Sequence, residues 1–160
     1  MPFLLFGHGY DRLHADNLMM KDNSPVQKPP VKKIITIDDE APIRSLIRHS
    51  LRQEDYEVIE AGDGNEGLEI IRREQPDLIV LDYVMPVMNG AETLRAIRSD
   101  PQIAHIPVLF LTGIKDLKKL EPLLQDSLND FLDKPFLVET LKERVRKLLH
   151  RESSAAIPRN

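Results

Sequence analysis

The sequence predicts an α/β protein of the doubly wound type, in which a parallel five-stranded sheet lies between two layers of helices as a three-layer sandwich. Two observations support this fold class. Five short apolar stretches alternate with five segments of helical periodicity between residues 32 and 150. Three of the apolar stretches, 32–38, 77–82 and 106–113, are apolar nearly throughout, as expected for strands buried on both faces.

The first strand segment, 32–38, is rich in β-branched residues and ends in acidic ones. Pro42 is suited to the first turn of a helix. The apolar positions that follow lie on one helical face: Ile43, Leu46, Ile47 and Leu51. Residues 56–61 form a weaker strand pattern, and Asp63 can cap a second helix. That helix carries one apolar face, made of Gly67, Leu68 and Ile71.

The third strand segment, 77–82, leads through Gly90 to a short helix marked by Leu94 and Ile97. The fourth strand segment, 106–113, precedes a helix with leucines at positions 117, 120 and 124, and we expect Pro122 to interrupt that helix or delay its start. Residues 130–136 form the last strand and a turn. The final helix has one apolar face, made of Val138, Leu141, Val145 and Leu148.

Composition excludes several classes of protein. The chain has 160 residues, 41% of them hydrophobic and 30% charged, and a net charge of −4, which argues against a general binder of nucleic acid or of membrane surfaces. There are no cysteines, so disulfides and thiolate metal sites are excluded. No apolar run reaches the roughly 18 residues of a membrane span. We therefore expect a cytoplasmic protein.

The two ends of the chain differ from the region between them. Residues 1–31 show neither a helix nor a strand period and contain Pro25, Pro29 and Pro30, which favour an extended linker. Residues 151–160 have the character of a short polar tail. The predicted domain is therefore 32–150, with a flexible extension before it and a tail after it.

Polar residues cluster where the predicted strands end. Asp38 and Asp39 follow the first strand, Asp82 ends the third, Thr112 ends the fourth and Lys134 follows the fifth. Because the carboxyl ends of parallel strands share one edge of the sheet, and ligands bind beyond that edge, we expect these side chains to converge there.

Converging carboxylates raise one another's pKa unless a cation neutralises them. Mg²⁺ suits such a site, because it is typically held by one or two carboxylates together with phosphate oxygens and water. A carboxylate beside Mg²⁺ can also act as a nucleophile toward a phosphoryl group, with a lysine and a hydroxyl to hold the phosphoryl oxygens. Asp82, on a rigid strand end beside a turn, is the best candidate for that nucleophile.

Each of these residues also has a simpler interpretation. Asp38 and Asp39 could cap a helix and Asp82 could begin a turn. Thr112 could be structural and Lys134 a solvated charge. The functional interpretation rests on all five lying at strand ends together.

At these residues the sequence resembles the receiver domain of two-component response regulators. The motifs "IDDE" followed by a helix, "LDYVMPVMNG", "VLFLTG" and "DFLDKPF" match that family in order and spacing, over about residues 32–150. The resemblance implies a CheY-like, flavodoxin-like (βα)₅ fold with strand order 2-1-3-4-5.

The resemblance also implies roles for the residues at the strand ends. Asp82 would accept a phosphoryl group from a phosphohistidine of a sensor histidine kinase or a histidine phosphotransfer protein. Asp39, Asp82 and the backbone carbonyl of Val84 would bind Mg²⁺ directly, and Asp38 would act through a metal-bound water. Thr112 would hold a phosphoryl oxygen.

Three more roles follow from the resemblance. Lys134 would hold the phosphoryl oxygens together with the threonine, and the Lys134–Pro135 bond would be a cis peptide. Phe131, which could equally be a core residue, takes the position of the family's switch aromatic but has no hydroxyl. The segment "DSLNDF" stands where the family usually has Gly-Ala, and because Ser127 makes a poor left-handed cap, we expect the fourth helix to be short, mobile or displaced.

The function that these features predict is signalling. The chain would catalyse only its own phosphotransfer and autodephosphorylation, and would be no enzyme otherwise. With only residues 151–160 after the last helix, we expect a stand-alone receiver that signals by phosphorylation-dependent docking of an effector protein on its fourth helix, fifth strand and fifth helix. Two alternatives are a receiver-like module that binds partners without phosphorylation, and a Mg²⁺-dependent phosphohydrolase with an aspartyl nucleophile. The second would need a general acid where Val84 stands.

Overall fold

The computed structural model describes residues 30–115 and 117–155, and this part of the chain alternates strands with helices. The strands are β1 (Lys33–Ile37), β2 (Glu57–Ala61), β3 (Leu78–Asp82), β4 (Val108–Thr112) and β5 (Asn129–Asp133). The helices are α1 (Ala41–Arg52), α2 (Gly64–Glu74), α3 (Gly90–Ser99), α4 (Leu117–Leu124) and α5 (Val138–Ala155). Helix α5 continues into the segment predicted as a tail. The predicted extension lies almost wholly outside the described residues.

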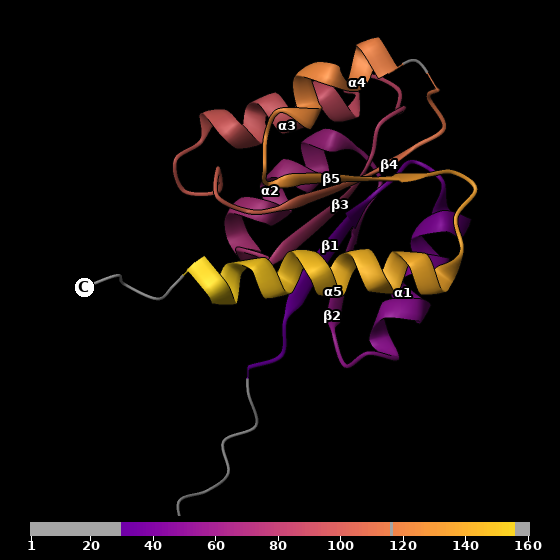
Figure 1. Cartoon of the computed structure of the whole chain (residues 1–160), viewed down its shortest axis with the longest axis vertical. Coiled ribbons are helices and arrows are strands. Elements are labelled where there is room, and N and C mark those ends of the chain that lie inside the picture. Colours follow the sequence, from indigo (N-terminus) through magenta and orange to yellow (C-terminus); the bar gives the residue numbers. More distant parts are fainter. Residues whose placement is uncertain (1–29, 116, 156–160) are drawn as a thin grey trace, which may run out of the picture. The chain divides into compact units, whose positions relative to one another are not determined.

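The five strands are all parallel and lie in the order β2-β1-β3-β4-β5. Helices α1 and α5 cover one face of the sheet, and α2, α3 and α4 cover the other (Figure 1). This confirms the predicted doubly wound, flavodoxin-like three-layer sandwich. Among the described helices, none combines the length and the apolar character that crossing a bilayer requires.

Two hydrophobic cores lie on the two faces of the sheet, and successive strand residues alternate between them. Ile34 and Val80 pack with helix α1 and α5 residues such as Leu51 and Val145. Their strand neighbours Ile35, Ile79 and Leu81 point the other way, where they pack with Ile71 of α2 and Ile97 of α3. Every residue of β3 and β4 is buried. Burial on both faces is the reason that these strand sequences are apolar throughout.

The helix starts follow the capping residues in the sequence. Pro42 lies in the first turn of α1, as predicted. The Asp63 side chain accepts a hydrogen bond from the backbone N–H of Glu66 at 2.9 Å and so caps α2, also as predicted. Helix α3 begins with a reciprocal capping box between Asn89 and Glu92. These caps fix where each helix leaves the carboxyl edge of the sheet.

Helix α4 is short, with 8 residues, but Pro122 lies inside it and does not interrupt it. The prediction that Pro122 would break or delay the helix was wrong, because α4 begins at Leu117 and runs through Pro122 to Leu124. No left-handed residue is needed at Ser127 either. Among the described non-glycine residues, positive φ angles occur elsewhere: Asp55, Gln75 and Val87.

The segment after α4 is instead held by a partly buried arginine, Arg98, near the end of α3. Its guanidinium donates to Asp126 Oδ2 at 2.6 Å and to Asn129 Oδ1 at 2.8 Å. It also donates to the carbonyls of Ala104 and Ile106, at 3.0 and 2.9 Å. One side chain therefore ties α3, the loop before β4 and the start of β5 together.

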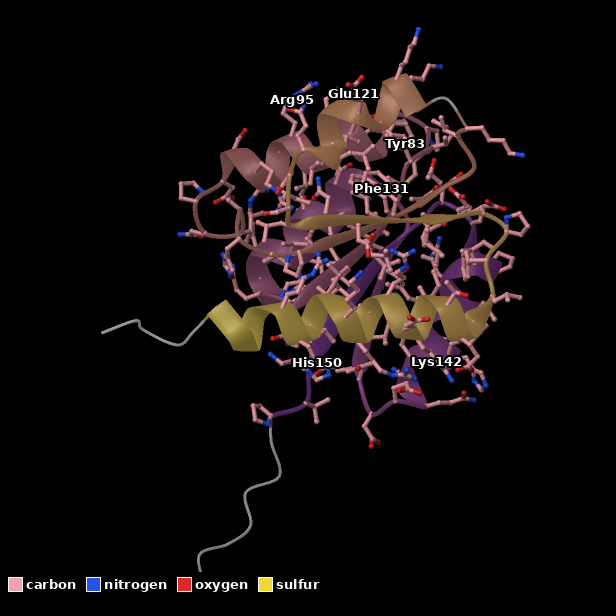
Figure 2. The ribbon with its side chains drawn as sticks, viewed as in Figure 1. Tyr83, Arg95, Glu121, Phe131, Lys142 and His150 are labelled. Atoms are coloured by element: carbon pink, nitrogen blue, oxygen red, sulfur yellow. The ribbon has the colours of Figure 1, made fainter. Side chains whose placement is uncertain are left out.

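We predict that Arg98→Met lowers the free energy of unfolding by about 2–4 kcal/mol, because it leaves a carboxylate, an amide and two carbonyls without their donor. The matched control is Arg95→Met on the same helix. Arg95 is exposed (Figure 2), so its loss is expected to cost less than about 0.5 kcal/mol. Urea unfolding of both variants makes the measurement, and equal values for the two would contradict the structural role of Arg98.

Candidate functional site

The carboxyl edge of the sheet brings the acidic residues of β1 and β3 together. Asp38, Asp39 and Asp82 each offer a carboxylate oxygen, and these oxygens lie within 4.8 Å of one another. The Lys134 ammonium, from the end of β5, lies 2.9 Å from Asp38 Oδ2 and 3.3 Å from Asp82 Oδ1. Residues almost a hundred positions apart thus meet at one point, because β1, β3 and β5 all point the same way.

The two acidic residues after β1 have different environments. Asp38 is fully buried, and its carboxylate accepts hydrogen bonds from the backbone N–H of Glu40 at 2.8 Å and from Lys134. Asp39 is exposed, and its side chain makes no hydrogen bond or ion pair within the described residues. The N-cap of α1 is Glu40, without a side-chain cap bond, so neither aspartate is the helix cap that the simpler interpretation proposed.

Asp82, the last residue of β3, is 4% exposed. Burial and the nearby charge of Asp38 raise the pKa of its carboxyl to about 6, against the opposing effects of Lys134 and of the Val84 N–H. That N–H lies 3.4 Å from Asp82 Oδ1, which is a long turn-type hydrogen bond. The ionised form of Asp82 is therefore electrostatically destabilised at neutral pH, and an added cation would stabilise it.

A single ammonium only partly neutralises this cluster. Burial lowers the pKa of Lys134, but its hydrogen bond to Asp38 and the charge of Asp82 raise the pKa more, so the net shift is upward. Lys134 is therefore charged at neutral pH and serves both buried carboxylates. Three carboxylates and one ammonium leave the site with net negative charge, and its oxygen donors fit a hard divalent cation such as Mg²⁺.

Gly90 explains the break in the chain that follows Asp82. A Cβ atom at this position would lie 2.5 Å from the Asp82 carbonyl oxygen and 2.8 Å from Tyr83 Cα. The Gly90 N–H donates to the Tyr83 carbonyl at 2.9 Å. Helix α3 thus starts directly against the backbone of Asp82, which only glycine permits. The turn between them leaves Val84 60% exposed.

Thr112 ends β4 at the same edge and is 1% exposed. Its Oγ1 accepts a hydrogen bond from the Ile114 N–H at 3.0 Å, and its carbonyl accepts one from the Lys134 N–H at 2.8 Å. Within the described residues Thr112 has no hydrogen bond to the acidic cluster. The Lys134–Pro135 peptide bond is cis in the structure.

Phe131 belongs to a run of aromatic rings that sequence reasoning missed. It stacks on Phe110 of β4, with ring centroids 5.2 Å apart and an interplanar angle of 16°. Tyr83, the residue after Asp82, meets Phe110 edge-on at 6.1 Å. Tyr83 and Phe131 both lie on the face covered by α3 and α4 (Figure 2). Phe110 looked like any other apolar strand residue, so no signal in the sequence marked it.

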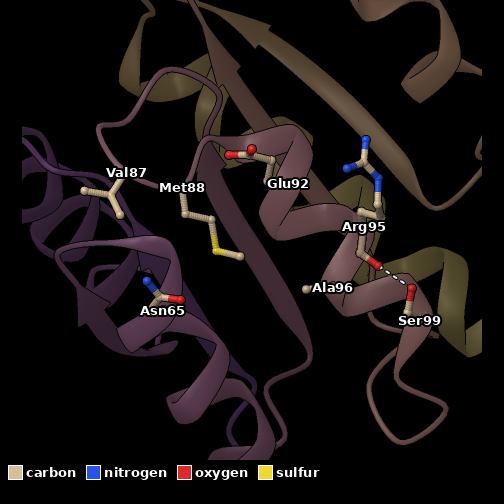
Figure 3. A pocket seen from close by; sticks show the side chains of 7 residues that line it. All are labelled: Asn65, Val87, Met88, Glu92, Arg95, Ala96 and Ser99. Carbon is tan, nitrogen blue, oxygen red and sulfur yellow. Dashed lines mark hydrogen bonds between the residues drawn. The ribbon is translucent and has the colours of Figure 1, made fainter.

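Two open grooves lie outside the acidic cluster. The first, with a volume of about 510 Å³, lies between the start of α2 and the outer side of α3 (Figure 3). The second, of about 420 Å³, runs between the end of β5 and α5. The second groove is lined in part by Phe131, Phe136 and Leu137. No residue of the acidic cluster lines either groove.

Comparison with known proteins identifies the family. The model of the response regulator receiver domain matches residues 34–146. The chain is 38% identical over 119 residues to the response regulator MprA of Mycobacterium leprae (strain TN), across 74% of this chain and 51% of that protein. It is 36% identical over 129 residues to the probable transcriptional regulator ycf27 of Porphyridium aerugineum, across 81% and 52% of the two chains.

A solved structure is also similar to this chain, in fold and in sequence. The chemotaxis protein CheY4 of Vibrio cholerae superposes with a TM-score of 0.68 at 34% identity, covering 74% of this chain and 99% of that one. The chain spans about half the length of the curated relatives that it matches. Because the family model covers most of the chain and the fold agrees with it, the protein belongs to the response regulator receiver domain family.

Proposed function

We propose that the chain accepts a phosphoryl group on Asp82 in a Mg²⁺-dependent reaction and signals by phosphorylation-dependent docking to a partner protein. Receiver domains are phosphorylated by histidine kinases. The donor here would be a phosphohistidine of a sensor histidine kinase or of a histidine phosphotransfer protein. The observation that carries the proposal is the Asp82 carboxylate at a strand end, among two further carboxylates and beside the Lys134 ammonium.

In the proposed transfer, an Asp82 oxygen attacks phosphorus as the phosphorus–nitrogen bond of the donor breaks. The imidazole nitrogen keeps the bonding electron pair. Asp82 must be ionised to attack, and a pKa of about 6 leaves it mostly ionised at neutral pH yet more basic than an ordinary aspartate. Lys134 and Thr112 would hold the phosphoryl oxygens through charge and hydrogen bonds.

The acidic cluster would hold the Mg²⁺ ion. Asp39, Asp82 and the Val84 carbonyl would bind it directly, and Asp38 would act through a water. When bound, the ion would offset charge on the phosphoryl oxygens. The exposed and unpaired Asp39 supports this assignment, because a carboxylate without a protein partner is available to a metal from solvent.

Docking would follow from a shift around Thr112 and Phe131. A phosphoryl group on Asp82 adds negative charge and acceptor oxygens, toward which the Thr112 hydroxyl could turn from its present bond with the Ile114 N–H. That movement would bias the Phe131 ring and the surface of α4, β5 and α5 between two arrangements. The groove between β5 and α5 supports docking there, since Leu137 on its rim is 75% exposed.

The two alternatives have less support. A phosphohydrolase would need a general acid two residues after the nucleophile, and Val84 has no proton to give. A module that binds partners without phosphorylation would not need three carboxylates and an ammonium at one point. Both alternatives are separated from the main proposal by the measurements below.

Incubation with acetyl phosphate and Mg²⁺ is expected to add the mass of one phosphoryl group to the wild-type chain and none to Asp82→Asn, which keeps the shape but not the nucleophile. Intact-mass spectrometry measures this. Modification of Asp82→Asn would contradict the assignment. Continuous release of phosphate from phosphate esters would favour the hydrolase, and no modification under any condition would favour the phosphorylation-independent module.

Mg²⁺ is expected to raise the melting temperature at pH 7.5 by binding the folded state, and this effect should fade as the pH falls through about 6 and Asp82 takes up a proton. The direction of the pH dependence of stability follows from the raised pKa of Asp82. In the absence of metal, stability from this group decreases as pH rises from about 4 to about 6, since the folded state then holds the proton more tightly than the unfolded state.

Asp82→Asn is the control for this measurement. It should melt higher than the wild type without metal at pH 7.5 and should respond less to Mg²⁺, because the neutral amide removes both the repulsion and one ligand. A Mg²⁺ response of equal size at pH 7.5 and pH 5 would contradict the site.

Beryllofluoride, a stable mimic of the phosphoryl group, is expected with Mg²⁺ to shift the backbone amide resonances of Phe131 and Leu137 in the wild type. Thr112→Ala should still bind Mg²⁺ but lose most of these shifts, because the hydroxyl that would follow the phosphoryl group is gone. Resonances of Arg73 on α2 serve as the unaffected reference. Shifts of equal size in Thr112→Ala would contradict the proposed route to the docking surface.

A further inference from the structure

We infer that Arg44 of α1 is a positioning residue for the metal ligand Asp39. This inference rests on the proposed function, since Asp39 matters here as a ligand of Mg²⁺. The observation behind it is a hydrogen bond of 2.6 Å from Arg44 Nη1 to the backbone carbonyl oxygen of Asp38. That carbonyl belongs to the peptide group from which Asp39 extends.

The carbonyl group of Asp38 lies beyond the sheet, because the chain turns between the end of β1 and the start of α1. Strand β1 ends at Ile37, and α1 begins at Ala41. The Asp38 N–H still donates to the Ala61 carbonyl of β2 at 3.2 Å, but its own carbonyl already lies beyond the strand. A buried carbonyl without a hydrogen-bond partner destabilises the folded state. Arg44 reaches back from the first turns of α1 and supplies the donor.

Two contacts bear on the peptide group between Asp38 and Asp39. The Glu40 N–H, bonded to the Asp38 carboxylate, closes a turn that spans this peptide group. Arg44 is the donor that holds its carbonyl oxygen, so the turn and the guanidinium together set the peptide plane. Within the described residues the Asp39 side chain has no partner of its own, so its direction is set by that plane. Arg44 therefore helps to set where the Asp39 carboxylate points.

The guanidinium also brings positive charge to the acidic edge of the sheet. It lies within 3.9 Å of the position that a Cβ of Gly62 would take, in the loop between β2 and α2. The Gly62 N–H donates to Glu66 Oε2 at 2.7 Å, which holds this loop in place beside Arg44. The charge of Arg44 is thus placed beside the cluster but outside the carboxylate oxygens that would take the metal.

Arg44→Met removes the guanidinium and keeps most of the apolar stem. We expect the dissociation constant for Mg²⁺, measured by isothermal titration, to rise about tenfold, as is typical when a group that orients a metal ligand is lost. The rate of phosphorylation by acetyl phosphate at saturating Mg²⁺ should stay within about threefold of the wild type, since Arg44 does not touch the reacting atoms. The backbone amide of Glu40, which is bonded to the Asp38 carboxylate across the same peptide group, should also exchange faster with deuterium in the metal-free variant.

Arg48→Met is the matched control. Arg48 lies one turn further along α1 and pairs with Glu60 at 3.5 Å, so its loss removes the same charge from the same helix. This variant should bind Mg²⁺ within about twofold of the wild type. An Arg44→Met affinity within twofold of the wild type, or an equal loss in Arg48→Met, would overturn the inference.

The outcome separates this inference from the proposed function. If the wild-type chain binds Mg²⁺ and is phosphorylated while Arg44→Met behaves like it, only the role of Arg44 is wrong. If the wild-type chain neither binds Mg²⁺ nor is phosphorylated, the proposed function fails, and the role of Arg44 falls with it. An unchanged hydrogen-exchange rate at Glu40 in folded Arg44→Met would also contradict the positioning role.

Discussion

The contact of the Lys134 ammonium with Asp38 and Asp82 is the interaction on which the site depends. It joins the end of β5 to the ends of β1 and β3, so it forms only when the whole sheet is assembled. Burial and the charge of Asp38 raise the pKa of Asp82, and the single ammonium offsets them only in part. The fold thus holds a buried carboxylate in an unfavourable state that an added cation would relieve.

The fold can maintain this unfavourable state because the support around it is rigid. Asp82 ends a strand that is buried on both faces, and α3 starts against its backbone at Gly90, where no side chain fits. The neighbouring ring of Tyr83 packs against Phe110, which in turn stacks on Phe131. Asp82, the proposed acceptor, and the surface proposed to respond to it are therefore linked through a dense core, in which small shifts are transmitted instead of absorbed.

Two arginines donate hydrogen bonds to backbone carbonyls where the chain enters or leaves the sheet. Arg98 does so before β4, at Ala104 and Ile106, and Arg44 does so after β1, at Asp38. A guanidinium suits this task, because it carries several donors on a long stem and stays charged when partly buried. One arginine fixes the segment around α4, and the other fixes the acidic edge.

Much of the fold and of the candidate site could be predicted from local sequence. Apolar strands, the Asp63 cap and the order of the strand-end motifs depend on residues close together in the chain, and the structure agrees with them. The sequence also placed Asp38, Asp82 and Lys134 at one sheet edge, because parallel strands share their carboxyl ends. The continuity of α4 through Pro122 was not foreseen, because proline is unfavourable inside a helix.

Tertiary structure alone decided which atoms meet. That Asp38 is buried and paired while Asp39 is exposed follows from how β1 turns into α1, and nothing in two adjacent aspartates distinguishes them. The stacking of Phe131 on Phe110 likewise depends on the register of two strands. The sequence by itself determined the elements and the chemistry available at the edge. Distances and burial, which set the pKa of Asp82, arise only when the strands are packed side by side.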